Sequence, residues 1–406
     1  MSGATVEAAG SPSIWRRRPF WNLFVPAIGV GLEQQIVFIA LPLLVYQASA
    51  SAIEMNLVRA LGLMPNLLLA FLIGALVDQA NKKNWLVAAL IVQGTCLVGL
   101  ASAFGSGLTH PLVIYPLVFA LSTAVYAYYN AQTAALKMAL RQDELGPATA
   151  AMSSVGQTFQ MLGPALAGLL LMLPAPSASL WAAAAVAVMS LAAILPLALA
   201  SSSPPQGGRL RDRVLEGWRA LRANRPMWLS TLVVIVANCA EGMFNITMLQ
   251  KAQALGLSGA EIGLMFSAAG ATGLAGALLA PWIRARITMG GASLFGLGVM
   301  TLCYVAAAVA SQAITLTAVL AVEALGGMVY SVMIWTLRQE TTPVAVIGRV
   351  TGLTGSLFKL AMPFAIVGAG FLSEHSGLTA VFAASAALGA AMVVAFAASP
   401  VLRTLR

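Results

Sequence analysis

Apolar stretches of about 20 residues follow one another along almost the whole chain, and positive charges fall in every second gap between them. All but three of the 22 Lys and Arg residues lie in these gaps or in the tails, and the other gaps hold only Lys251. Because backbone amides in lipid need internal partners, stretches of this length predict membrane helices rather than the shorter strands of a barrel. The charge bias predicts that both termini lie in the cytoplasm.

The amino-acid composition also indicates a membrane protein. Hydrophobic residues make up 60% of the sequence and charged residues 9%, which leaves too little polar surface for a water-soluble protein of this size. In a soluble protein the net charge of +9 would suggest nucleic acid, but the topology already explains it here. We expect the lipid bilayer as a partner and no nucleic acid. The three cysteines and two histidines lack metal-site spacing, so we expect no metal and no cofactor.

We predict an all-α membrane protein with twelve transmembrane helices in two pseudo-symmetric six-helix bundles. Its predicted parts are a cytoplasmic tail (1–19), a bundle (20–200), a cytoplasmic linker with an amphipathic helix (201–226), a second bundle (227–400) and a cytoplasmic tail (401–406). The predicted spans are 20–47, 55–78, 85–105, 111–136, 149–173, 178–200, 227–250, 260–282, 289–309, 314–337, 349–373 and 377–399.

An internal repeat supports two related halves. The segments 156–164 and 355–363 share Gly, Phe and Pro at the same spacing, in the fifth and eleventh spans. Leu-Arg-Gln-Asp (140–143) and Leu-Arg-Gln-Glu (337–340) end the fourth and tenth spans at nearly the same separation. Many secondary transporters use such repeats to build a site between halves that rock against each other.

The turn after the second span has a distinctive order of residues: Gly74, then Asp78, then Lys82 and Lys83. This pattern resembles the signature loop of the major facilitator superfamily, and the resemblance extends over about residues 15–400. Gln79 and Asn81 depart from the usual pattern. The resemblance implies a gating motif in which a carboxylate and basic side chains hold one conformation closed. The alternative is a solvated turn whose lysines only follow the charge bias.

Two further segments narrow the resemblance. Ala40–Tyr46 and Arg338–Pro343, followed by Gly348–Val350, look like the branch that contains macrolide exporters and the enterobactin exporter. The fifth span is similar to the Gly-Pro motif of antiporters, although Ala167 replaces a usual glycine. Close helix packing is the structural alternative for this motif, which comprises Gly156, Gly163, Pro164 and Gly168.

Ionisable residues inside spans are costly and are functional candidates by default. Glu33 resembles the first-span acid of many relatives, and we predict that it couples transport to protons. Arg59, Glu241, Glu323 and Lys359 are candidates for the substrate cavity. The positive pair would suit an anionic substrate such as a siderophore and would repel a cationic drug. The alternative is that these five residues pair with one another and only fix the packing of the helices.

Aromatic and polar residues extend the predicted cavity. Tyr126, Tyr129 and Asn130 share one face of the fourth span, and Glu323 and Tyr330 share one face of the tenth. Gln34, beside Glu33, adds hydrogen-bonding capacity. Such a mixed cavity suits a bulky amphipathic solute.

The sequence therefore predicts a secondary active transporter, not an enzyme, in the inner membrane of a Gram-negative-like bacterium. We expect a monomer that exports a siderophore or a drug-like molecule in exchange for protons. An importer of the same fold is the main alternative, and a non-transport membrane sensor is a minor one.

Overall fold

The computed structural model describes residues 14–69, 72–73, 76–77, 80–173, 175, 177–199, 210–343 and 346–405, and every regular element among them is helical. In the first half of the chain the elements are a short 3-10 helix (Ile14–Arg16), α1 (Arg18–Ser49), α2 (Ala52–Leu61), α3 (Met64–Leu68), α5 (Lys82–Ser106), α6 (Pro111–Ala139), α7 (Gln142–Leu170) and α8 (Ala178–Ile194). In the second half they are α9 (Leu210–Ala223), α10 (Arg225–Ala254), α11 (Gly259–Arg286), α12 (Met289–Val309), α13 (Ala313–Thr341), α14 (Ile347–Phe358), α15 (Met362–Ser376), α16 (Leu378–Ala398) and α17 (Pro400–Arg403).

Within the described residues, nine helical stretches are long and apolar enough to cross a membrane. Three of the twelve predicted spans, 55–78, 149–173 and 178–200, do not meet that standard. The described part of the second span is broken after α2, because Gly62 ends the helix and Pro65 lacks the amide hydrogen that a continuous helix needs. Helix α7 is 29 residues long but polar, and α8 stops after 17 residues, just before Pro196.

Large apolar side chains cover the outside of the helices. Leu112 and Val309 are each 80% exposed, and Leu278 is 74% exposed. A water-soluble protein would bury these side chains or cover them with a partner, whereas lipid tails solvate them at no cost. The exposed belt therefore faces the membrane.

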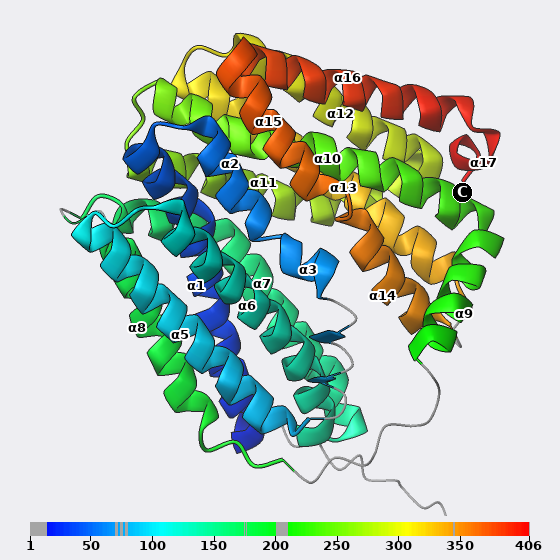
Figure 1. Ribbon diagram of the computed structural model, residues 1–406. Helices are drawn as coiled ribbons and strands as arrows, with labels where there is room; N and C mark the ends of the chain where they lie inside the picture. Colours follow the sequence, from blue (N-terminus) through cyan, green and yellow to red (C-terminus); the bar gives the residue numbers. More distant parts are fainter. Residues whose placement is uncertain are drawn as a thin grey trace, which may run out of the picture.

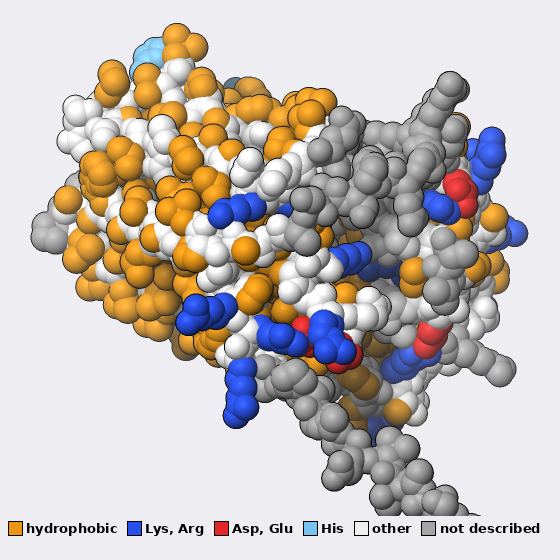
Figure 2. All heavy atoms as spheres, turned by 90° about the horizontal axis from the view of Figure 1, so that it is seen from below, with side chains coloured by type: hydrophobic (Ala, Val, Ile, Leu, Met, Phe, Trp, Pro, Cys, Tyr) orange, Lys and Arg blue, Asp and Glu red, His pale blue; other side chains and the backbone are white. Residues whose placement is uncertain are grey.

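The first and last described residues, Ile14 and Leu405, lie on one face of the bundle, which we call the termini face, and the opposite side is the far face (Figure 1). Helix α5 begins at Lys82 and α11 ends at Arg286, so basic residues stand at the helix ends of the termini face. Seen from below, Lys and Arg side chains gather over one part of the molecule, beside a broad hydrophobic area (Figure 2). This segregation is the pattern that the spacing of charges in the sequence predicts.

Each half of the chain forms its own helical bundle. In the first half, α1 packs against α7 and α8, and α5 packs against α6 and α8. In the second, α13 packs against α11 and α12, and α16 packs against α10 and α12. The two halves converge at one end and diverge towards the other, so the molecule has the outline of a V (Figure 1).

Contacts between the halves follow two helix pairs, α7 with α11 and α2 with α15. Figure 1 shows α2 beside α15 near the convergent end of the molecule. This end is the far face, because α2 begins there and α15 ends there. The cavity between the halves is therefore closed on the far face by these two pairs.

The repeat in the sequence has a counterpart in the hydrogen bonds. Just before α1, Arg17 Nε donates to Glu144 Oε1 of α7 at 2.7 Å. Just before α10, Asn224 Nδ2 donates to Thr341 Oγ1 of α13 at 2.9 Å. Each half thus ties the start of its first long helix to the segment at the end of its fourth.

Candidate functional site

The first cavity lies beside the middle of α1 and has a volume of about 360 Å³. Helices α1, α2 and α6 supply most of its lining, and Lys359 is the contribution of the second half. Glu33 lies in its wall with 1% of its surface exposed. Its Oε2 atom has no hydrogen-bond partner among the described residues. A carboxyl group held in this way is available to a proton or a ligand.

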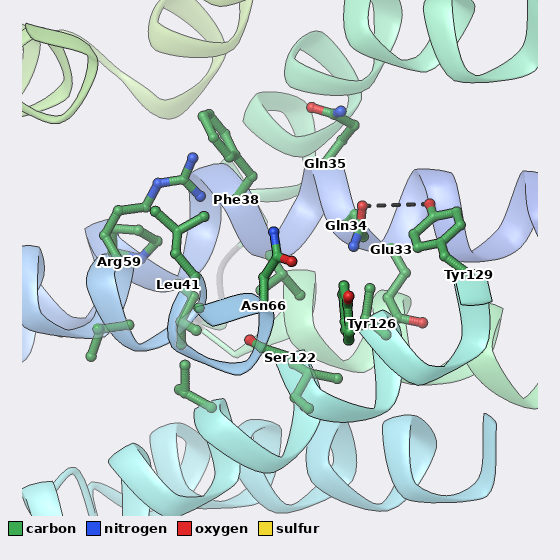
Figure 3. A pocket seen from close by; sticks show the side chains of 18 of the residues that line it. Glu33, Gln34, Gln35, Phe38, Leu41, Arg59, Asn66, Ser122, Tyr126 and Tyr129 are labelled. Carbon is green, nitrogen blue, oxygen red and sulfur yellow. Dashed lines mark hydrogen bonds between the residues drawn. The ribbon is translucent and has the colours of Figure 1, made fainter. Parts of the chain in front are cut away.

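Tyrosines flank Glu33 at its end of the cavity. Tyr126 and Tyr129 both line the cavity, and the Tyr129 hydroxyl points to Gln34 Oε1 at 3.5 Å, a long hydrogen bond (Figure 3). Asn130 is not in the lining. Its amide donates instead to the carbonyl of Tyr126 in its own helix, at 2.8 Å. The shared helix face therefore brings the two tyrosines to the cavity but not the asparagine.

Arg59 stands at the other end of this cavity. Its guanidinium carbon lies 3.7 Å from the centroid of the Phe38 ring, in the geometry of a cation–π contact. Arg59, Phe38 and Gln35 line a second cavity as well as the first. The two cavities therefore share one wall, with the guanidinium at their junction.

The second cavity has a volume of about 390 Å³ and lies between the halves. Glu241 of α10 and Glu323 of α13 both line it. Glu323 is buried and lies beside the buried Tyr304. The predicted Tyr330 does not line either cavity. Its Cβ and backbone amide lie close to Gly296 of α12 instead, where the absence of a side chain leaves room for them.

Lys359 lies at a break between two helices. Helix α14 ends at Phe358 and α15 begins at Met362, with Pro363 in its first turn. Asn238 of α10 donates to the freed carbonyl of Phe358 at 2.7 Å, which stabilises the break. Lys359 is exposed there and lines the first cavity.

The five ionisable residues of the spans, Glu33, Arg59, Glu241, Glu323 and Lys359, do not pair with one another at ion-pair distance. The ion pairs among described residues join other side chains. The purely structural interpretation requires an ion pair of Glu33 or Glu241 with Arg59 or Lys359. The described residues do not form such a pair. The five charges are brought into two adjoining cavities, where none of them forms an ion pair with another described residue.

Helices α2 and α15 close the far face with hydrogen bonds. Glu374 of α15 accepts from Ser51 Oγ at 2.6 Å and from the amide of Ile53 at 3.1 Å, so it caps the start of α2 from the other half. Deeper in, Asn56 donates to the carbonyl of Ile366 at 2.9 Å and accepts from Gln250 at 2.8 Å. Neither Asn56 nor Gln250 is among the predicted site residues, which were chosen as charged residues within the spans or as polar and aromatic residues beside them or on a shared helix face.

Helices α7 and α11 close the far face differently, with glycines. A Cβ on Gly263 would meet the carbonyl of Pro164 and lie 2.8 Å from the Cα of Gly168. The amide of Ala165 donates to Ser267 Oγ at 2.8 Å. The Gly-Pro segment of α7 thus forms a backbone contact between the halves, whereas Gly163 packs against Gln35 of α1 and Gly156 has no neighbour this close.

The predicted gating motif is only partly within the described residues. Gly74 and Asp78 lie outside them. Lys82 begins α5 and donates to the carbonyls of Val77 at 2.6 Å and Ala80 at 3.0 Å, so it organises the preceding turn. Lys83 follows it with a partly exposed side chain.

Comparison with known proteins agrees with this architecture. The family model for the Major Facilitator Superfamily matches residues 23–366. The multidrug efflux pump Tap of Mycolicibacterium fortuitum is 26% identical, over 91% of this chain and 92% of the pump. The pump of the same name from Mycobacterium tuberculosis is 24% identical, over 91% of this chain and 90% of the pump.

Solved structures are similar in fold at low sequence identity. A crystal structure of the nucleoside transporter NupG matches with a TM-score of 0.74 and 11% identity, over 96% of this chain and all of that one. A bacterial homologue of the iron transporter ferroportin, in an inward-facing state, matches with a TM-score of 0.70 and 14% identity, over 93% of this chain and 98% of that one.

Two helical bundles around a shared, partly charged cavity define a membrane transporter. The chain belongs to the major facilitator superfamily. The predicted class of protein, a transporter rather than an enzyme, is confirmed.

Proposed function

We propose that this protein exports small amphipathic molecules from a bacterial cytoplasm in exchange for protons. The observation that carries the proposal is Glu33, a buried carboxyl group whose Oε2 atom has no hydrogen-bond partner among the described residues, in a cavity lined by tyrosines. A carboxyl group that meets two aqueous phases in turn can load a proton from one and release it to the other. The name of the Tap relatives, multidrug efflux pump, supports export and a drug-like cargo.

In this proposal the termini face is the cytoplasmic face of the inner membrane, as the distribution of Lys and Arg favours. The far face is then the outer side, and its closure by α2 with α15 and by α7 with α11 corresponds to an inward-open state. The remaining predicted spans complete twelve crossings. One chain contains both halves of the cavity, so a monomer suffices.

The transport cycle follows from this arrangement. Cargo enters the cavity from the cytoplasm while the far face is closed. Rocking of the halves then breaks the contacts on the far face and closes the cytoplasmic side, where Asp78, Lys82 and Lys83 act as the gate. A proton taken up by Glu33 on the outer side returns with the empty transporter.

The test is cargo accumulation in everted membrane vesicles, in which export appears as uptake driven by an imposed proton gradient. Glu33→Gln should abolish gradient-driven accumulation while leaving the amount of protein in the membrane unchanged. Glu261→Gln is the matched control, because Glu261 only caps its own helix. Gradient-driven transport by the Glu33 variant at the normal rate would remove Glu33 from the coupling role, and gradient-driven accumulation in right-side-out vesicles alone would establish an importer.

A further inference from the structure

Arg59 and Lys359 form what we call the cationic pole of the first cavity. Arg59 comes from α2 in the first half of the chain, and Lys359 comes from the break between α14 and α15 in the second. Both line the same cavity of about 360 Å³. Neither forms an ion pair with a described residue. Two cations that share a cavity repel each other, and an anion placed between them relieves that repulsion.

The contact of Arg59 with Phe38 leaves its hydrogen-bond donors available. The ring occupies one face of the flat guanidinium, at 3.7 Å from ring centroid to Cζ. The N–H groups lie in the plane of the guanidinium and point away from the ring. A planar fork of this kind matches the two oxygens of a carboxylate, sulfonate or phosphate.

Phe38 also packs edge-on against Phe266 of the second half, with 6.3 Å between ring centroids. The guanidinium is therefore positioned where the two halves meet. An anion held by Arg59 and Lys359 would contact both halves at once.

The first cavity has opposite chemical character at its two ends. Arg59 and Phe38 lie at one end, and Glu33 lies with Tyr126 and Tyr129 at the other (Figure 3). Phe38 follows Glu33 by five positions in α1, which is about 7.5 Å along the helix. The apolar side chains of Leu41 and Val125 complete the wall. The cavity is therefore long enough to hold an acid group at one end and an apolar body against the tyrosines.

We propose that the preferred cargo is an amphipathic acid, with its carboxylate, sulfonate or phosphate bound between Arg59 and Lys359. This inference rests on the proposed function and specifies the class of cargo. The position of Lys359 in the second half of the repeat corresponds to the uncharged Gln160 in the first half. Binding of an acid explains why only one of the two positions carries a charge.

The direct test is fluorescence titration of the purified protein in nanodiscs with two probes that differ in one charge, dansylglycine and its neutral amide. We expect the wild type to bind the acid about tenfold or more tightly than the amide, as expected for charge-assisted hydrogen bonds in a partly dry cavity. Arg59→Gln and Lys359→Gln should each remove this preference, and Arg59→Lys should retain part of it. Lys137→Gln, which removes an exposed charge outside the cavity, is the control and should behave as the wild type.

Unchanged binding of the neutral amide shows that a variant has kept its cavity. Equal binding of both probes by the wild type would overturn the inference, as would a full acid preference in both Gln variants. The vesicle assay separates this inference from the proposed function. Acid-selective binding without gradient-driven export would support the site and reject the exporter, whereas export that ignores the charge of the probe would reject the site alone.

Discussion

Replacing Glu374 by alanine should favour the state in which the far face is open. Its carboxylate is the only described cap of α2 that comes from the other half, through Ser51 Oγ at 2.6 Å and the amide of Ile53 at 3.1 Å. Loss of a helix cap costs about 1 kcal/mol, and the solvent exposure of the carboxylate keeps the value at this level rather than above it. The ratio of open to closed molecules should therefore rise about fivefold.

Pulsed electron spin resonance can measure this ratio. Spin labels at Leu112 and Ile314 report on the opening, because both side chains are highly exposed and stand at far-face helix ends, one in each half. The three native cysteines are first replaced by alanine. In the Glu374→Ala variant the population with the longer distance should increase about fivefold.

Glu261→Ala is the control for this experiment. Glu261 also caps a helix on the far face, but through Ser258 of its own helix, so its loss leaves the contact between the halves intact. A distance distribution in Glu374→Ala that matches the wild type would refute the role of this cap in closing the far face. An equal shift in both variants would assign the effect to helix capping in general.

Three further outcomes are expected. Gly263→Ala should lower the midpoint of thermal unfolding in detergent, because its Cβ would meet the backbone of α7, at a cost of about 1–3 kcal/mol, whereas Gly298→Ala has open space and should not. Asn56→Ala should leave the buried Gln250 amide without one partner and open the far face, which cysteine-labelling rates on that face would detect. Glu33→Gln should retain cargo binding by the purified protein while losing gradient-driven export, and loss of binding in titrations would place Glu33 among the cargo ligands instead.

The helical membrane fold follows from the sequence because it depends on local properties. A stretch such as α16 has no charged residue among its 21 residues, and lipid leaves a backbone of this length no alternative to the helix. The breaks are less predictable. Pro65 and Pro363 each permit a kink, but the Phe358 carbonyl is stabilised in its broken state by Asn238, a residue 120 positions away.

The charged residues of the candidate site were predictable from the sequence, because a charged residue within an apolar span is conspicuous. Glu33, Arg59 and Lys359 line the first cavity, because an ionisable side chain inside a span must find polar surroundings. Tyr330 shows the limit of the helix-face argument. It lies seven residues after Glu323, yet its Cβ and backbone amide lie against Gly296, and only the packing of α12 on α13 reveals this contact.

The prediction that Asn130 lines the cavity is wrong for a related reason. A polar side chain in a span can form its hydrogen bond within its own helix, as Asn130 does by donating to the Tyr126 carbonyl. Such a side chain does not need a polar cavity. The amides of Asn56 and Gln250 are the opposite case, since they pair across the halves. A search of the predicted spans for neutral amide side chains would have identified Asn56 and Gln250.

The glycine contact between α7 and α11 has a mechanical consequence. Gly168 and Gly263 meet backbone to backbone, and among the described residues one hydrogen bond, from the Ala165 amide to Ser267 Oγ, joins α7 to α11. The α2–α15 side, in contrast, must release at least four hydrogen bonds that join Glu374, Asn56 and Gln250 to their partners. Opening of the far face must therefore break more hydrogen bonds along α2 and α15 than along α7 and α11, so the α2–α15 side contributes more of the hydrogen bonding that keeps the far face closed.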